Sequence, residues 1–110
     1  MDGGFSQLSW HDVGAIDDIP RSGARTVATR HGAVALFRTT DDHVFALEDR
    51  CPHKHGRLSQ GIVHGHSVTC PLHNWVIGLA DGMAELPDEG CARTHAVRLD
   101  GRRILLAVAA

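Results

Sequence analysis

The chain alternates apolar and polar residues with the period of two that is typical of half-buried β-strands. No stretch keeps the 3.6-residue apolar period of an amphipathic helix, so we expect little helix. Short apolar runs separated by polar turn segments are typical of an all-β protein. The expected strands lie at residues 10–13, 24–30, 33–37, 43–48, 62–63, 67–69, 75–77, 94–99 and 103–108.

Turn-forming residues separate these runs and indicate how the strands connect. His31-Gly32, the segment 40–42, Asp81-Gly82 and Asp100-Gly101 each favour a turn, so we expect an antiparallel meander of short hairpins. Residues 1–7 are expected to form a loose terminus. The 110 residues are enough for a modest core, and we expect a single domain that spans residues 1–110.

The charge and the apolar content exclude two classes of partner. The formal net charge of −2, from 11 Lys and Arg against 13 Asp and Glu, argues against a nucleic-acid partner. No apolar run approaches the roughly 18 residues that span a bilayer, and the first residues lack the features of a signal peptide. The odd number of cysteines, three, suits a reducing compartment. We therefore expect a cytoplasmic protein that binds neither nucleic acid nor membrane.

Two short stretches carry the candidate chemistry: Cys51 with His53, and Cys70 with His73. They give the pattern C-x-H, sixteen intervening residues, then C-x-x-H. A 2Fe–2S cluster of the Rieske type needs two cysteines and two histidines, because two histidines replace two cysteines on one iron. A proline directly after each cysteine stiffens the loop and removes a backbone donor. These four residues are the expected ligands.

Structural zinc is the other common use of a Cys₂His₂ set. Zinc sites usually pair cysteine with cysteine and histidine with histidine, in C-x₂₋₄-C and H-x₃₋₅-H spacings. Each arm of this motif instead carries one cysteine and one histidine. The spacing therefore favours the iron–sulfur cluster over zinc.

The double motif resembles the Rieske domain family, and this resemblance implies three stacked antiparallel sheets with the cluster at the tip of two loops. Within that family, residues 51–106 resemble the small subunit of assimilatory NAD(P)H nitrite reductase. The likeness rests on residues 58–63 (L-S-Q-G-I-V), 70–77 (C-P-L-H-N-W-V-I), 89–91 (E-G-C) and 93–94 (R-T). Rieske ferredoxins and oxygenases more often have glycine where this chain has Asn74.

The resemblance implies a role for each ligand and for the chain as a whole. Cys51 and Cys70 would bind one iron, and His53 and His73 the other through Nδ1. The chain has no nucleotide-binding G-x-G-x-x-G or P-loop motif and no nucleophile-and-base arrangement, so it is expected to be an electron-transfer subunit. In the nitrite reductase family, a large partner subunit carries FAD, a 4Fe–4S cluster and sirohaem, and reduces nitrite to ammonium in six one-electron steps.

Two alternatives to this function stay open. The first is a Rieske ferredoxin that delivers electrons to an aromatic-ring oxygenase. The second is an interaction subunit of the same fold whose cluster is absent. The presence of all four ligand residues disfavours the second alternative.

The ligand set also indicates the reduction potential. Two thiolates leave the oxidised cluster with a net charge of about zero, compared with about −2 for four thiolates, and this raises Rieske potentials above those of plant-type ferredoxins. Family members of high potential carry a further cysteine in each loop and a serine two residues past the second histidine, where this chain has Gly56, Leu72 and Trp75. We therefore expect the low end of the Rieske range, roughly −150 to 0 mV.

The remaining histidines and the third cysteine are expected to have no role in the cluster. His55 is interpreted as a solvated loop residue, and His64 and His66 as a hairpin tip with too few converging ligands for a metal. Cys91 is expected to be a small buried residue, and Trp75 either covers the cluster or fills the core. The other histidines show no partner pattern and are expected at the surface: His11, His31, His43 and His95.

Overall fold

The computed structural model describes residues 8–30, 32–52, 56–71, 74–85 and 90–109, and within them the predicted all-β fold is confirmed. These residues contain two short 3₁₀ helices, η1 (Ile16–Asp18) and η2 (Leu58–Gln60), and no α-helix. The terminal segment 1–7 lies outside the described residues. The strands are β1 (Leu8–Ala15), β2 (Gly23–Thr29), β3 (Gly32–Arg38), β4 (Val44–Glu48), β5 (Ile62–His64), β6 (Ser67–Thr69), β7 (Val76–Gly78), β8 (Thr94–His95), β9 (Val97–Asp100) and β10 (Arg103–Ala109).

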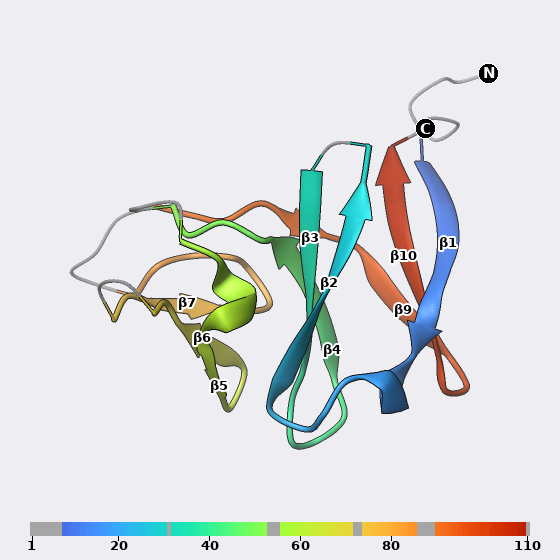
Figure 1. Cartoon of the computed structure of the whole chain (residues 1–110), viewed down its shortest axis with the longest axis horizontal. Coiled ribbons are helices and arrows are strands. Elements are labelled where there is room, and N and C mark those ends of the chain that lie inside the picture. Colours follow the sequence, from blue (N-terminus) through green and yellow to red (C-terminus); the bar gives the residue numbers. More distant parts are fainter. Residues whose placement is uncertain (1–7, 31, 53–55, 72–73, 86–89, 110) are drawn as a thin grey trace.

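The strands form three antiparallel sheets (Figure 1). β2, β3 and β4 are consecutive neighbours, as the turn residues predict, and β8 completes this four-stranded sheet. β5, β6 and β7 form a second meander. The first strand departs from the expected meander, because β1 pairs with β10 near the other end of the chain, and β9 completes that sheet. Figure 1 shows the four-stranded sheet between the other two.

The central strand β3 is buried on both faces by the neighbouring sheets. Successive side chains of a strand point to opposite faces, and both sets are buried from Val34 onward. Ala35 and Phe37 pack in one hydrophobic cluster with residues of β5, β6 and β7. Val34 and Leu36 pack in a second cluster with residues of β10. Two apolar faces explain why residues 34–37 form a continuous apolar run in the sequence.

One predicted strand, at residues 94–99, is two strands in different sheets. β8 pairs with β4, whereas β9 pairs with β10. The break falls at Ala96, whose carbonyl accepts a hydrogen bond from the Ala107 N–H at 3.0 Å. A period of two indicates which side chains share a face, but it does not indicate which strand is the partner. The sequence pattern therefore does not predict that the chain passes from one sheet to another between β8 and β9.

The two Asp-Gly sequences differ in what surrounds the glycine. Gly82 and Gly101 both have left-handed backbones, with φ of 71° and 60°. A Cβ at Gly82 would lie 2.1 Å from the Ala92 carbonyl oxygen, whereas a Cβ at Gly101 would meet nothing within 4 Å. Gly82 is therefore needed for the close approach of two backbone segments as well as for its own φ angle.

Gly82→Ala should destabilise the protein more than Gly101→Ala. We expect Gly101→Ala to lower the free energy of unfolding by about 1 kcal/mol, which is the usual cost of a left-handed alanine. Gly82→Ala should lower it by about 2 kcal/mol more, because the backbone must shift to relieve the clash. Denaturant unfolding of both variants and the wild type measures the two losses. Equal losses would show that the contact with Ala92 relaxes freely.

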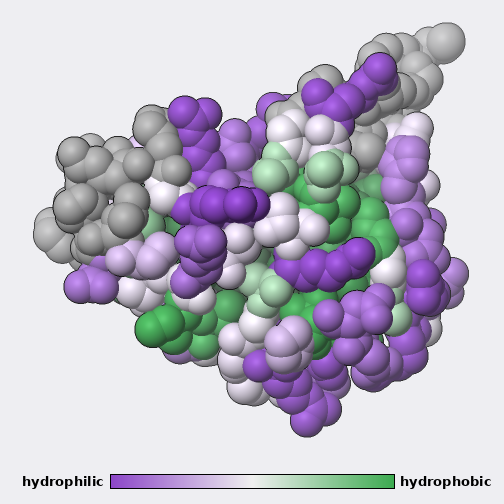
Figure 2. Space-filling view, in the orientation of Figure 1, coloured by the Kyte–Doolittle hydropathy of each residue, from purple (hydrophilic) through white to green (hydrophobic). Residues whose placement is uncertain are grey.

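The surface in the view of Figure 2 is mainly hydrophilic, and hydrophobic residues show only in patches. The large hydrophobic residues exposed in the described chain are Trp10, Ile62, Met83 and Leu99.

The Arg98 guanidinium lies 4.7 Å from the ring centroid of Trp10, so this ring makes a cation–π contact across the β1–β10–β9 sheet. Among the described residues, no helix combines the length and the apolar character needed to cross a bilayer.

Candidate functional site

Both predicted cysteine ligands are buried in the same part of the core. Cys51 and Cys70 are each 1% exposed and belong to the hydrophobic cluster that also contains residues of β3 and β5–β7. No disulfide joins the cysteines of the described chain. The predicted ligands His53 and His73 lie outside the described residues, so the complete set of four ligands stays a prediction.

The loop that begins at Cys51 is closed at its base by two sets of hydrogen bonds. The Cys51 N–H donates to the Gly56 carbonyl at 2.7 Å. Beside it, the Asp49 carboxylate accepts hydrogen bonds from the N–H and from the hydroxyl of Ser59, both at 2.7 Å. These bonds join the end of β4 to η2 across the base of the loop. The loop therefore leaves the core at a defined place.

The loop that begins at Cys70 is closed in the same way. The Cys70 N–H donates to the Trp75 carbonyl at 2.7 Å, and the Asn74 N–H donates to the Cys70 carbonyl at 3.2 Å. In both loops the N–H of the cysteine thus bonds the carbonyl five residues further along the chain. The shared backbone arrangement places the two cysteines in equivalent positions.

Asn74 has a backbone conformation that few residue types accept. Its φ is 58°, in the left-handed region. Glycine adopts this conformation freely, and asparagine tolerates it better than most other residues. Asn74 and the glycine that Rieske ferredoxins more often have at this place therefore meet the same backbone requirement. It follows that Asn74 is a weaker guide to the subfamily than the sequence alone indicates.

A third segment, at Gly90, packs over both loops. A Cβ at Gly90 would lie 3.2 Å from Cβ of Pro52 and 3.6 Å from Cζ3 of Trp75, so glycine allows the backbone to approach both loops closely. Trp75 is half-buried and packs against the cluster that contains both cysteines. Trp75 therefore fills space between the second loop and the core.

The prediction that Cys91 is buried is wrong. Cys91 is exposed and forms an isolated β-bridge with Met83. The next residue, Ala92, is only 3% exposed. Because adjacent residues in an extended chain point to opposite sides, the inward position belongs to Ala92 and Cys91 faces solvent.

Most histidines outside the motif lie at the surface, as predicted. His11 is exposed and His95 is half-buried. His64 is exposed at the β5–β6 hairpin, and its Nε2 lies 2.7 Å from the Thr69 hydroxyl. His31 and His55 lie outside the described residues.

Two features near the candidate site could not be predicted from the sequence: the burial of Asp49, and the contacts of Asp41 with two histidines. Asp49 has a fully buried side chain, yet it stands in the charged run Glu48-Asp49-Arg50, and nothing in that run marks the central residue as buried. His43 is exposed, as predicted, and lies beside Asp41 and near His66. The expectation that too few ligands converge at the hairpin tip is therefore wrong for His66. Asp41 and His66 are 25 residues apart, so their spacing gives no signal of the contact.

The described donors fit an iron–sulfur cluster. Soft thiolate ligands suit iron–sulfur clusters, zinc and copper(I), and the spacing of the two histidines favours the cluster among these. Apolar surroundings such as those of Cys51 and Cys70 disfavour added charge. A cluster with two thiolates and two imidazoles carries less charge than one with four thiolates, so it suits this site.

Comparison with known proteins agrees with the geometry of the site. A family model described as the Rieske [2Fe-2S] domain matches residues 9–99. The anthranilate 1,2-dioxygenase ferredoxin subunit of Burkholderia cepacia is 35% identical over 95 residues, which cover 84% of this chain and 87% of that protein.

Solved structures of two kinds superpose on the chain over most of its length. One is a Mycobacterium tuberculosis protein described as a candidate NADH-dependent nitrite reductase small subunit, with a TM-score of 0.83 and 27% identity over 94% of this chain and 97% of that chain. The other is the ferredoxin of carbazole 1,9a-dioxygenase from Nocardioides aromaticivorans, with a TM-score of 0.80 and 25% identity over 89% of this chain and 96% of that chain.

Proposed function

Because the chain belongs to the Rieske [2Fe-2S] domain family, we propose that it is the electron-transfer small subunit of a cytoplasmic NAD(P)H-dependent nitrite reductase. Its partner in this proposal is a large subunit that carries FAD, a 4Fe–4S cluster and sirohaem. That subunit reduces nitrite to ammonium, and the small subunit delivers electrons one at a time.

The observation that carries the proposal is the whole-length likeness to the Mycobacterium tuberculosis protein described as a candidate nitrite reductase small subunit. The resemblance of residues 58–63, 70–77 and 89–94 to the nitrite reductase family supports it independently of the fold. The sequence has no nucleotide-binding motif, so the chain needs a partner for nicotinamide chemistry.

The chain's own residues bind and orient the centre. A bound 2Fe–2S cluster supplies one-electron transfer. Cys51 and Cys70 present their sulfurs from loops whose bases are closed by backbone hydrogen bonds, and the apolar cluster around them excludes water. The Gly90 backbone packs close to Pro52 and Trp75, which lie beside the predicted ligands in the sequence. A site whose surroundings are packed in this way would need little rearrangement when an electron arrives or leaves.

A ferredoxin that serves an aromatic-ring oxygenase is the second candidate. The specific observation in its favour is the identity of 35% to the anthranilate 1,2-dioxygenase ferredoxin subunit. The backbone requirement at Asn74 also removes one argument against it. Both candidates are one-electron carriers, so the partner protein distinguishes them.

The test is to reconstitute electron transfer with a nitrite reductase large subunit from the same organism. We expect nitrite-dependent NAD(P)H oxidation by the wild-type complex. The Cys70→Ala complex should assemble but lose at least about 90% of this activity, a factor of ten, because the carrier has lost a ligand. An artificial donor that reduces the sirohaem directly should still support nitrite reduction. Cys91→Ala, a change at an exposed cysteine, is the matched control and should keep full activity.

Other outcomes would assign a different function. Full NAD(P)H-linked turnover by the Cys70→Ala complex would indicate an assembly role without a cluster. If the chain leaves nitrite reduction unaffected but supports hydroxylation by a ring oxygenase, it is a Rieske ferredoxin.

A further inference from the structure

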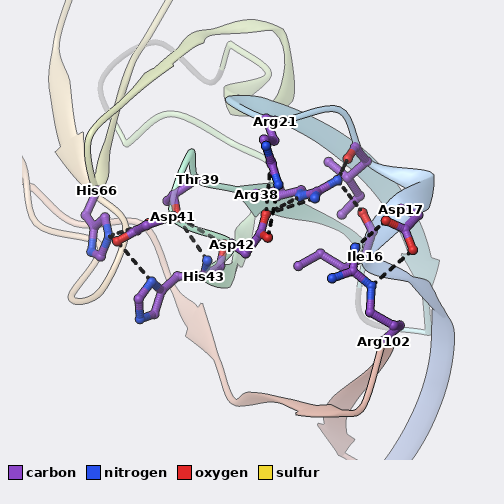
Figure 3. A network of polar contacts seen from close by, with 11 residues as sticks. Ile16, Asp17, Arg21, Arg38, Thr39, Asp41, Asp42, His43, His66 and Arg102 are labelled. Carbon is purple, nitrogen blue, oxygen red and sulfur yellow. Dashed lines mark hydrogen bonds and ion pairs between the residues drawn. The ribbon is translucent and has the colours of Figure 1, made fainter.

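Three side chains with metal-binding groups converge where two sheets meet. Asp41 and His43 lie between β3 and β4, and His66 lies between β5 and β6. His66 Nε2 is 3.0 Å from Oδ2 of Asp41, and His43 Nδ1 is 3.2 Å from the same oxygen. One ligand atom from each residue lies within 4.8 Å of the other two. Figure 3 shows both imidazoles turned toward the Asp41 carboxylate.

The turn that carries Asp41 and His43 is held in place by Thr39. Thr39 is fully buried, and its hydroxyl donates to the Asp41 carboxylate. The same hydroxyl accepts a hydrogen bond from the His43 N–H at 3.0 Å, and the Thr39 N–H donates to the His43 carbonyl at 2.9 Å. One buried side chain therefore fixes the acid and the first histidine relative to β3.

The neighbouring acid, Asp42, is occupied by a different partner. It has a left-handed φ of 62°, and its Oδ1 lies 2.8 Å from the guanidinium of Arg38, which is only 7% exposed. Figure 3 shows Asp42 facing Arg38 and Arg21, apart from the two histidines. The Asp42 carboxylate is therefore engaged elsewhere, and Asp41 is the acid that faces the imidazoles.

His66 reaches the turn from the second sheet and is positioned by ring contacts. Its ring packs edge-on against Phe45 with centroids 5.2 Å apart, and it lies 5.0 Å from the ring of His43. Its backbone carbonyl accepts a hydrogen bond from the Leu79 N–H at 2.9 Å. The three groups are thus brought together by the fold.

We propose that Asp41, His43 and His66 form a binding site for a divalent transition-metal ion, with Zn²⁺ as the type case. Two imidazole nitrogens and one carboxylate oxygen are a set that zinc takes in three-ligand sites, with water as the fourth ligand. Donors around a tetrahedral zinc lie about 3.3–3.6 Å apart when the bonds are about 2.0–2.2 Å long. The observed separations of 3.0 and 3.2 Å to Asp41 are close to this, and all three ligand atoms lie within 4.8 Å of one another.

Exposure and charge both suit a reachable cation site. The side chains of Asp41, His43 and His66 are 54%, 60% and 44% exposed, so an ion can enter from solvent. The hydrogen bond from Thr39, followed by that from His66, lowers the pKa of the Asp41 carboxyl well below its usual range. The carboxylate is therefore ionised at neutral pH.

An ion at this site joins the two sheets that enclose the cysteines. His66 and Cys70 lie at opposite ends of β6, so the ion holds the β5–β7 sheet, with its ligand loop, against the four-stranded sheet. A ligand that binds only the folded state stabilises that state. We therefore expect Zn²⁺ to raise the thermal unfolding midpoint.

Calorimetric titration of Zn²⁺ into the untagged protein, with its cluster in place, tests the site. We expect one saturable site per chain. His66→Gln and His43→Gln should each weaken binding about tenfold or more, because each removes a ligand. His64→Gln is the matched control, since His64 is exposed on the same hairpin and contacts Thr69. It should leave the affinity unchanged, and the visible spectrum of the cluster should stay constant throughout the titration.

The proposal fails if no saturable binding occurs below about 1 mM Zn²⁺. It also fails if the His66→Gln and His43→Gln proteins, shown to be folded by circular dichroism, bind as tightly as the wild type. Loss of the cluster spectrum in step with saturation would show that the ion takes the cysteine ligands, and this too would overturn the proposal.

Discussion

Cys70→Ala should give a folded protein that has lost its iron–sulfur cluster. A Rieske centre has only two thiolate ligands, so one substitution removes half of them. The framework should survive, because cysteine packs as a small apolar residue and its loss costs about 1 kcal/mol of burial. We expect iron and acid-labile sulfide to fall from about two of each per chain to near zero. Metal analysis and the EPR signal of the reduced protein measure this, and circular dichroism checks the fold.

The third cysteine provides the control for this prediction. Cys91 is exposed and lies outside the motif, so Cys91→Ala should keep the full cluster. Equal loss in the two variants would show that the cysteines act through folding rather than as ligands. A tetrahedral zinc site without labile sulfide in the wild-type protein would contradict the iron–sulfur assignment itself.

The strand pairings that were predictable from the sequence are those between neighbours along the chain. The β2–β3–β4 meander and the β5–β6 and β9–β10 hairpins follow from apolar alternation and turn residues, which are local signals. The pairing of β1 with β10 joins the two ends of the chain, and no local signal encodes it. The same limit hides the change of sheet at Ala96.

The candidate site also has some features that the sequence predicts and others that only the fold reveals. The spacing of Cys51 and Cys70 with their histidines predicts the ligands, and this set stays a prediction because His53 and His73 lie outside the described residues. Other features depend on contacts between separate segments of the chain. Ala92 faces inward in place of Cys91 because that segment pairs with Met83. Asp41 contacts His66, which is 25 residues away. Residue type and spacing therefore indicate the chemistry, whereas the supporting contacts require the fold.

Asp49→Ala should lower the free energy of unfolding by about 3 kcal/mol, because the Asp49 carboxylate accepts three hydrogen bonds of 3.2 Å or less and each contributes about 1 kcal/mol. Its side chain is fully buried and joins β2 and η2 to the end of β4. It accepts hydrogen bonds from Ser59 N–H and Oγ, both at 2.7 Å, and from the Thr26 hydroxyl at 3.2 Å, and Arg57 Nε lies 3.4 Å away. Alanine removes the buried acceptor of these part-buried hydrogen bonds, and the space that the carboxylate filled is left empty. Denaturant unfolding measures the loss.

Two matched variants separate burial from charge. Asp49→Asn keeps the volume and one acceptor oxygen, so it should lose about half as much stability as Asp49→Ala. Asp12→Ala removes an acid that also makes two hydrogen bonds to an arginine, Arg103, at 2.8 and 3.0 Å, but at the surface. Surface ion pairs contribute little, so the Asp12 variant should be nearly as stable as the wild type. If Asp49→Ala destabilises no more than Asp12→Ala, the base of the first loop does not depend on the Asp49 carboxylate.

If the base of the first loop does depend on Asp49, the Asp49→Ala protein should also release its cluster faster in air than the wild type. The reason is that Cys51 lies only two residues beyond Asp49.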